Sequence, residues 1–332
     1  MVEAAFADSS ALLEAHEAGV DIFVFGGMAE TARAQWDGFE TEFADDLDVT
    51  RVESWMQAHA NEKPLPRPTL QRSGDSLPPS NDLGKVAVFA GLLPTGGGVG
   101  KDTFSFNVAA WLSRQGQDVA LVELDPFGTL VDKLGVTPLA TVDLWLDAQE
   151  EPTEATIRRT LSQTSFGFSI LAASATHQLL PEEAVLRITK GLRRVYDVLI
   201  LNLGSGQTSG YYASLGVATH LYLMGQGDRG KFRVYRRVLD ELVPQCAVTP
   251  KVVLNRHYDK DAAGLWEDEF GGVPPFVSVL EDARVFGAME RGDAVGLKMP
   301  KRPFGAAVKT IGEDILGHAV ETKKGGGRLW PF

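Results

Sequence analysis

One stretch constrains the fold of this chain more than any other: an apolar run at residues 86–93 enters a glycine-rich loop, and a helical pattern follows at residues 104–112. The loop contains four glycines and, directly after them, a lysine: Gly96, Gly97, Gly98, Gly100 and Lys101. Glycines let backbone N–H groups curl around an anion, and a helix N-terminus adds the positive end of its dipole. This order of elements is typical of a phosphate-binding loop in which Lys101 neutralises the outer phosphates. The alternative is a loop at the start of a helix that binds nothing.

From residue 85 onward, apolar strands alternate with helices. The predicted strands are residues 86–90, 119–123, 168–172, 198–203, 220–224, 251–254 and 276–279. The predicted helices are residues 103–114, 154–162, 182–195, 229–242, 262–269, 283–291 and 305–321. This pattern predicts an α/β fold of the P-loop NTPase kind, with a mostly parallel central sheet and helices on both faces. Ligands bind such sheets at the carboxyl ends of the strands, which is where the glycine loop lies.

Two carboxylates, Glu123 and Asp125, stand at the end of the second predicted strand. Alternate residues of a strand point to the same face, so both side chains can face the phosphate loop. Carboxylates in this place hold magnesium, directly or through water, or orient an attacking water. Two solvated acids at a strand end are the alternative interpretation.

Two later strands end in amides instead of acids. Asn202 ends the strand at residues 198–203, and its amide accepts hydrogen bonds from water but carries no charge to balance Mg²⁺. Asn255 and Arg256 follow the strand at residues 251–254. A side-chain amide in that position can read the edge of a base by paired hydrogen bonds.

The sequence divides into four parts. Residues 1–56 form a short N-terminal α/β segment, with helices expected at 10–17 and 29–36 and strands at 20–25 and 49–52. Residues 57–84 contain five prolines and are expected to be an extended linker. Residues 85–322 form the main domain. Residues 323–332 combine glycines with basic and aromatic residues, which predicts either a docking tail or a disordered end.

Composition excludes some functions. The net charge of −12 argues against broad electrostatic binding to nucleic acid. The single cysteine, Cys246, excludes an intrachain disulfide and is expected to be a packing residue. No apolar run approaches the roughly 20 residues that cross a bilayer, and the N-terminus lacks a signal-peptide pattern. We therefore expect a cytoplasmic protein.

Five stretches together resemble the ParA/MinD superfamily of deviant Walker-A ATPases, over residues 85 to about 318. They are residues 97–101 with Asn107, 121–128, 196–203, 252–256, and 279–285 followed by Ala288, Gly292 and Pro300. The chain looks most like the CpaE/TadZ branch, which is linked to the assembly and polar placement of Flp (Tad) type IV pili. Members of that branch often carry a receiver-like domain before a linker, and residues 1–56 are short enough to be a reduced form of it.

The resemblance implies a site for ATP or ADP with Mg²⁺. The nucleotide-binding positions are Gly97, Gly98, Val99, Gly100, Lys101, Asp102, Thr103, Asn255 and Arg256. The implied metal ligands are Asp102 and Asp125, and the implied catalytic residues are Asp125 and Glu123. It further implies a homodimer, partners in the pilus or secretion machinery, and a location at the inner face of the membrane or the cell pole.

Four departures from the family pattern fall in this site. Gly96 replaces the signature Lys, Asp102 the magnesium-binding Thr, Glu123 the first strand-end Asp, and Asn202 the Walker-B Asp. These changes predict a positioning or scaffold protein that binds nucleotide weakly or not at all. The alternatives are a working Mg-ATPase with relocated groups that positions another cargo (a flagellum, chromosome or plasmid), and a protein whose last helix and tail touch anionic lipid.

An arginine-rich stretch lies within the helix predicted at residues 229–242. Arg229, Arg233, Arg236 and Arg237 make one basic face on an otherwise acidic protein. Such a face is either simply solvated or meets an acidic partner, for example the acidic segment 40–48 of this chain or of a dimer mate.

Overall fold

The computed structural model describes three short strands near the N-terminus and then residues 83–92, 98–146, 152–204, 208–258 and 261–319. The chain separates into two compact units, Met1–Asp75 and Ser76–Phe332. The helices expected at 10–17 and 29–36, the strand at 49–52, most of the linker and the tail at 323–332 lie outside the described residues. The same holds for loop residues 93–97, which include Gly96 and Gly97.

The first unit contains a parallel three-stranded sheet in the order β1-β2-β3. Its strands are β1 (Val2–Glu3), β2 (Phe23–Gly26) and β3 (Glu40–Phe43). The strand expected at residues 20–25 overlaps β2. Strands β1 and β3 were not predicted, because both are short and polar.

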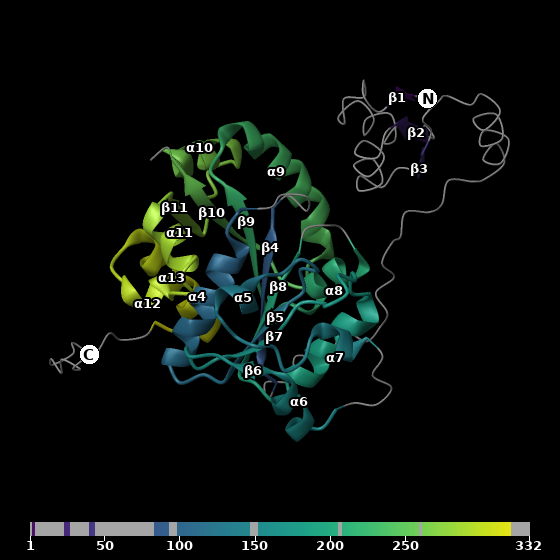
Figure 1. Ribbon diagram of the computed structural model, residues 1–332. Helices are drawn as coiled ribbons and strands as arrows, with labels where there is room; N and C mark the ends of the chain where they lie inside the picture. The colour runs from purple at the N-terminus through teal and green to yellow at the C-terminus, as the bar shows by residue number, and fades with distance from the viewer. Residues whose placement is uncertain are drawn as a thin grey trace, which may run out of the picture. The chain divides into compact units, whose positions relative to one another are not determined.

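The second unit is built on an eight-stranded sheet in the order β11-β10-β9-β4-β8-β5-β7-β6 (Figure 1). Its strands are β4 (Lys85–Gly91), β5 (Val119–Glu123), β6 (Ser162–Gln163), β7 (Ser169–Leu171), β8 (Val198–Asn202), β9 (His220–Gln226), β10 (Lys251–His257) and β11 (Val277–Leu280). All neighbouring strands pair in parallel except β6, which is antiparallel to β7. The predicted mostly parallel α/β fold is confirmed, and β6 is an addition to it.

Ten α-helices, α4 to α13, connect or cover these strands in the described part of the second unit. They are α4 (Lys101–Arg114), α5 (Leu130–Lys133), α6 (Glu154–Thr160), α7 (Glu182–Leu192), α8 (Ser209–Val217), α9 (Arg229–Leu242), α10 (Ala262–Glu269), α11 (Ala283–Met289), α12 (Val295–Lys298) and α13 (Pro303–Leu316). The bounds of α9 and α10 agree with the prediction residue for residue. Short 3-10 turns follow at η2 (Val142–Trp145) and η3 (Val243–Gln245).

Two helices differ from the sequence-based expectation for identifiable reasons. Helix α8 was not predicted, because its glycines lower intrinsic helix propensity. One of these glycines permits close packing of the helix, since a Cβ on Gly210 would lie 2.1 Å from the Leu180 carbonyl oxygen. Helix α13 ends at Leu316 instead of continuing to 321, because Gly317 adopts a left-handed conformation with φ of 81°.

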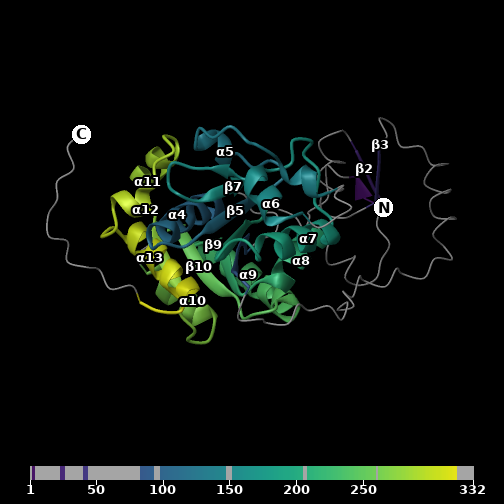
Figure 2. The same ribbon diagram turned by 90° about the horizontal axis from the view of Figure 1, so that it is seen from below.

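The helices cover both faces of the sheet (Figure 2). Helices α4 and α11 to α13 lie on one face, and α7, α8 and α9 lie on the other. Alternate strand residues divide between the two cores: Ala87 and Phe89 of β4 belong to the first, and Val86 and Val88 to the second. Because both faces are covered, the strands are apolar throughout, as the sequence pattern indicated.

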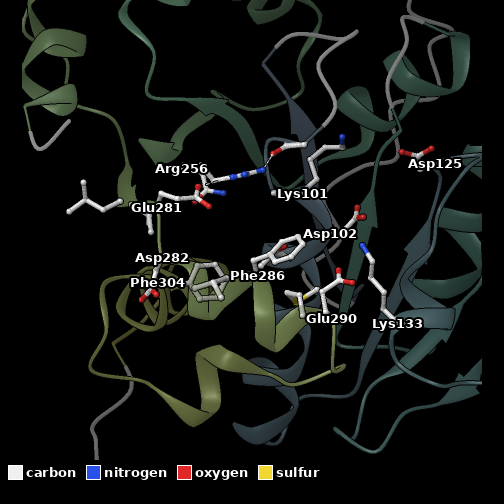
Figure 3. A pocket seen from close by; sticks show the side chains of 18 residues that line it. Lys101, Asp102, Asp125, Lys133, Arg256, Glu281, Asp282, Phe286, Glu290 and Phe304 are labelled. Atoms are coloured by element: carbon white, nitrogen blue, oxygen red, sulfur yellow. Dashed lines mark hydrogen bonds and ion pairs between the residues drawn. The ribbon is translucent and has the colours of Figure 1, made fainter. Parts of the chain in front are cut away.

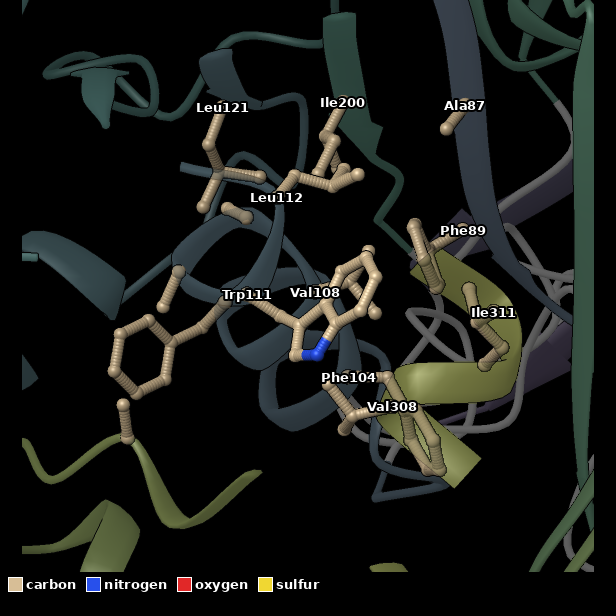
Figure 4. Close-up of a cluster of buried hydrophobic side chains, with 14 of the residues drawn as sticks. Ala87, Phe89, Phe104, Val108, Trp111, Leu112, Leu121, Ile200, Val308 and Ile311 are labelled. Atoms are coloured by element: carbon tan, nitrogen blue, oxygen red, sulfur yellow. The ribbon is translucent and has the colours of Figure 1, made fainter. Parts of the chain in front are cut away.

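Helix α4 is the most buried of the described helices and begins directly after the glycine loop. Phe104, Val108 and Trp111 of α4 pack between the sheet and α13 (Figure 4). A Cβ on Gly312 of α13 would lie 2.2 Å from the Trp111 ring, so the two helices meet closely at this glycine. This packing holds the N-terminus of α4 firmly at the carboxyl edge of the sheet.

The apolar face of α13 is used inside the fold. Ala307, Ile311 and Ile315 are buried there as expected, whereas Ala319 lies beyond the helix end and is exposed. Within the described ranges, no helix is long and apolar enough to cross a membrane.

Candidate functional site: a phosphate-loop pocket

A pocket of about 290 Å³ lies where the glycine loop, α4 and the carboxyl ends of the strands meet (Figure 3). It brings together most of the site residues predicted from the sequence: Gly98, Gly100, Lys101, Asp102, Thr103, Asp125, Asn255 and Arg256. Of the other predicted residues that the structure describes, Val99 is buried behind the loop and Glu123 lies beneath the pocket. Gly97 lies outside the described residues.

Lys101 is the first residue of α4, directly after the glycine loop. Gly100 precedes it with φ of 96°, a left-handed conformation that turns the chain into the helix. The Lys101 side chain is only 7% exposed. It makes no hydrogen bond or ion pair with any residue that the structure describes, so its ammonium group is available to an anion at the helix N-terminus.

The end of β10 holds the glycine loop in place. The Asn255 amide Nδ2 donates to the Val99 carbonyl oxygen at 2.9 Å. Arg256 donates from Nη1 to the Gly98 carbonyl oxygen at 2.9 Å and forms an ion pair from Nε to Glu281 at 2.8 Å. The backbone of Arg256 has φ of 54°, which is uncommon for a residue with a side chain. The sequence indicated that the Asn255 amide can read a base edge; in this structure its nitrogen binds the loop.

Asp102 and Asn202 contact each other directly. The Asn202 amide Nδ2 donates to Asp102 Oδ1 at 2.9 Å, joining the second residue of α4 to the last residue of β8. The Asn202 side chain is completely buried. Its carbonyl Oδ1 has no hydrogen-bond partner among residues 83–319 as far as they are described.

Glu123 and Asp125 have different surroundings although they end the same strand. Asp125 lines the pocket, and its Oδ1 accepts a bond from the Phe127 N–H at 3.0 Å. Glu123 is fully buried, and its Oε1 accepts from the Leu130 N–H at 2.9 Å. Its Oε2 has no partner in the described part of the chain. Burial, together with the nearby carboxylates of Asp102 and Asp125, raises the pKa of Glu123 to about 7.

The pocket also contains residues that the sequence analysis missed. Lys133 comes from the short helix α5 and extends toward the Asp102 end of the pocket (Figure 3). The opposite wall is apolar and includes Phe304, which is buried, and Phe286, which is 65% exposed. Phe286 and Phe304 follow the segment at 279–285 that the resemblance pointed to, but no local pattern marked them or Lys133 as site residues.

Acidic side chains outnumber basic ones around the pocket. The basic residues are Lys101, Lys133 and Arg256, and the acidic residues are Asp102, Asp125, Glu281, Asp282 and Glu290. Asp282 is partly neutralised by Arg302 at 3.8 Å, and Glu281 by Arg256. The remaining carboxylates oppose a bare polyphosphate, so a cation must accompany such a ligand.

Comparison with known proteins decides the family. The profile of the CobQ/CobB/MinD/ParA nucleotide binding domain matches residues 92–295. The chain belongs to this family. The chromosome-partitioning ATPase Soj of Thermus thermophilus is 37% identical over 244 residues, which are 68% of this chain and 94% of Soj.

Solved structures of the ParA/MinD type share the fold. A ParA family ATPase from Chlorobium tepidum aligns with a TM-score of 0.59 at 19% identity, over 71% of this chain and 98% of that one. The septum site-determining protein MinD from Pyrococcus horikoshii, solved with Mg-ADP, aligns with a TM-score of 0.57 at 18% identity, over 70% and 95%. At this identity the likeness establishes the eight-stranded P-loop architecture.

The donor set of the ParA/MinD-like pocket fits magnesium that arrives with a nucleotide. Mg²⁺ prefers carboxylate oxygens, keeps several waters and takes further ligands from phosphate. Asp102 and Asp125 line the pocket and offer such oxygens. The described ranges contain no group of three or more His, Cys, Asp or Glu side chains arranged to hold a metal ion by itself. Phosphate and water would therefore complete the coordination.

The four arginines of helix α9 do not line the candidate pocket, although Arg229 lines a neighbouring hollow together with Arg256. Arg229, Arg233, Arg236 and Arg237 are exposed, and Phe232 and Tyr235 on the other side of the helix are buried. Arg236 donates to the Glu269 carbonyl oxygen at 3.1 Å. Cys246 is half-buried, with a thiol pKa that burial raises to about 11, which agrees with a packing role.

Proposed function

We propose that this ParA/MinD-family chain is a spatial-positioning or scaffold protein of the CpaE/TadZ type, which serves the assembly of Flp/Tad type IV pili and binds ATP or ADP weakly with Mg²⁺. The observation that carries the nucleotide proposal is Lys101. It lies almost buried at the N-terminus of α4, in a pocket at the carboxyl edge of the sheet, and none of the described residues forms an ion pair with it.

Weak binding follows from the charges of the pocket. Asp102 occupies the position directly after Lys101, where an uncharged hydroxyl would be compatible with phosphate, and it adds a carboxylate beside the phosphate loop. Asn202 ends β8 without the charge that an aspartate would bring to Mg²⁺. Taken singly, each change lowers affinity: the Asp102 carboxylate repels a polyphosphate that carries no metal, and Asn202 brings no charge to Mg²⁺.

The scaffold role has further consequences that we propose with it. The protein acts as a homodimer in the cytoplasm, at the inner face of the membrane or the cell pole, and contacts proteins of the pilus or secretion machinery. A reduced receiver-like module is formed by residues 1–56, and a linker by residues 57–84. The ATPase-like domain comprises residues 85–322, and residues 323–332 serve as a docking tail. The net charge of −12 argues against DNA as the cargo.

Calorimetry tests the nucleotide site. Titration of ATP and ADP into wild type, with and without Mg²⁺, should give weak binding that Lys101→Ala reduces by about 100-fold, because it removes a charge-assisted contact to phosphate. Lys309→Ala is the matched control, since Lys309 pairs with Glu313 on α13 and does not line the pocket. Unchanged binding in Lys101→Ala would refute the site.

A genetic experiment tests the pilus role. Deletion of the gene in its own host should abolish Tad pili, and a fluorescent fusion should gather at the cell pole. Normal piliation after deletion, with a defect in flagellar placement or chromosome segregation, would refute the pilus role and favour another cargo.

A second candidate function is a working Mg-ATPase that positions such a cargo. The observation in its favour is Glu123, a buried carboxyl group at the end of β5 whose Oε2 has no partner in the described residues. Asp125 at the pocket and Glu123 beneath it are the candidate catalytic carboxylates. Metal-dependent phosphate release well above that of Lys101→Ala would support this candidate, and equal rates would exclude it.

A further inference from the structure

We infer that Asp102 and Asn202 have exchanged roles, so that α4 instead of the strand end carries the carboxylate for the metal, and Asn202 is a positioning residue that orients it. This inference rests on the proposed nucleotide site. Phosphate-loop sites commonly hold Mg²⁺ with a hydroxyl from the helix start and an aspartate from a neighbouring strand end. Here the helix start supplies the aspartate and the strand end supplies a neutral amide, so the pair keeps one negative charge.

The hydrogen bond between the two side chains makes them a unit. Asn202 Nδ2 donates to Asp102 Oδ1 at 2.9 Å, which fixes the carboxylate, and no described residue hydrogen-bonds to its Oδ2. Asp102 lines the pocket, whereas Asn202 is completely buried behind it. An aspartate at position 202 with Asp102 unchanged would place two mutually repelling carboxylates in direct contact. Asn202 is therefore the residue that orients Asp102 without adding a second negative charge.

Two buried acceptors beside Asp102 indicate what the unit is built for. Asn202 Oδ1 and Glu123 Oε2 are both without a partner in the described part of the chain, and both side chains are fully buried. Buried acceptors are normally satisfied, because leaving one unpaired costs stability. Both acceptors lie close to the Asp102 carboxylate, so their negative partial charges would attract a cation that Asp102 binds.

The charge of the pocket also supports a cation bound at Asp102. Apart from the Asn202 amide, no hydrogen bond to the Asp102 carboxylate is present in the described ranges, and Lys101 and Asp102 stand side by side at the helix start. A polyphosphate drawn to Lys101 would meet the Asp102 charge at once. A cation between the carboxylate and the phosphate turns that repulsion into two attractions. The alternative is that the Asp102–Asn202 bond closes the site to metal.

Binding measurements on matched variants distinguish these possibilities. ADP would be titrated with and without Mg²⁺, and Mn²⁺ binding would be followed by electron paramagnetic resonance in the presence of ADP. In wild type, we expect metal to raise ADP affinity at least about tenfold, which corresponds to roughly 1.4 kcal/mol. Asp102→Asn keeps the shape of the side chain. This variant should lose the dependence of ADP affinity on metal and should no longer bind Mn²⁺ in the presence of ADP.

The exchange itself is tested by reversing it. Asn202→Asp alone should weaken Mg-ADP binding, because it sets two carboxylates against each other. The double variant Asp102→Thr/Asn202→Asp should regain metal-dependent binding, because it restores one hydroxyl and one carboxylate. Circular dichroism checks that each variant folds; should Asn202→Asp not fold, Asp102→Asn and the double variant still decide the question.

Each other outcome counts against the inference. Full metal dependence in Asp102→Asn would show that Asp102 is not a metal ligand. Equal ADP affinity with and without Mg²⁺ in wild type would overturn the inference while leaving the proposed nucleotide site intact. No ADP or ATP binding under any condition would overturn both.

Discussion

At the amino edge of the sheet, Lys85 at the start of β4 and Lys251 at the start of β10 each bind α13. At the carboxyl edge of the same sheet, Glu123 at the end of β5 and Asn202 at the end of β8 each keep an acceptor oxygen without a partner in the described residues. Lys85 Nζ donates to the Ile315 and Leu316 carbonyl oxygens at 2.6 and 2.9 Å. Lys251 forms an ion pair with Asp314, which also accepts from the Tyr222 hydroxyl at 2.6 Å.

The difference lies in the partners that the two edges supply to these four side chains. At the amino edge, the C-terminus of α13 covers the sheet, and its carbonyls and Asp314 supply partners. At the carboxyl edge, no described residue supplies a partner to Glu123 Oε2 or Asn202 Oδ1. An unpaired buried polar group costs about 1–3 kcal/mol, whereas a paired one stabilises the fold. Neutralising Glu123 and removing Asp314 should therefore have opposite effects on stability.

The largest expected effect is a gain in stability from Glu123→Gln. Burial raises the pKa of Glu123 from an ordinary 4.5 to about 7, so the folded protein holds this proton to a higher pH than the unfolded chain does. The stability that Glu123 contributes is therefore fully present below pH 4.5, and about 3 kcal/mol of it is lost as the pH rises through 7. Glutamine at position 123 does not ionise, so the variant does not lose this stability as the pH rises. The free energy of unfolding is measured in urea with EDTA present. The difference between Glu123→Gln and wild type should be about 2 kcal/mol larger near pH 8 than near pH 5, in favour of the variant.

Glu290→Gln is the control for this measurement. Glu290 lines the same pocket but is exposed, so its replacement should leave the pH dependence of unfolding unchanged. An identical pH profile for wild type and Glu123→Gln would mean that Glu123 is solvated, and the contrast between the edges would fail.

A smaller effect of opposite sign is expected at the amino edge. Asp314→Ala leaves Lys251 and the buried Tyr222 hydroxyl without their shared acceptor and should lower the free energy of unfolding by about 2 kcal/mol. The estimate is moderate because the Asp314 and Lys251 side chains are 19% and 39% exposed.

Two comparisons accompany this variant. Asp240→Ala, on the exposed side of α9, should change the free energy of unfolding by less than about 0.5 kcal/mol. Nucleotide affinity of Asp314→Ala should equal that of wild type, because no residue of this cluster lines the pocket. A lower nucleotide affinity of Asp314→Ala would show that the amino edge influences the pocket, and it would contradict the distinction drawn between the two edges.

The smallest effect is expected for Lys85→Met. Lys85 completes the last turn of α13 by binding its terminal carbonyls, and methionine keeps the apolar stem without the donor. Loss of the two hydrogen bonds and of the charge at a helix C-terminus should lower the free energy of unfolding by about 1 kcal/mol. A slightly lower thermal midpoint would show this loss. Lys309→Met serves as the control, and an equal decrease in both would refute the role of Lys85.

Local patterns in the sequence determined the fold and the position of the site. Apolar runs of four to six residues between helical stretches predicted seven of the eight strands of the main sheet, because a strand buried on both faces must be apolar along its whole length. The glycines and Lys101 placed a phosphate loop at the carboxyl edge, since backbone freedom and charge are properties of the residues themselves.

Contacts between distant segments were decided by the tertiary structure alone. Asp102 meets Asn202 across 100 residues of chain, and Arg256 reaches Gly98 across 158. The burial of Glu123 and the delivery of Lys133 by a four-residue helix also depend on packing. Hydrogen bonds and pKa shifts arise from whichever atoms the folded chain brings within a few ångströms, and neither periodicity nor residue type specifies those partners. The sequence by itself therefore determined where a phosphate site would lie, and only the packed structure decided how its charges are arranged.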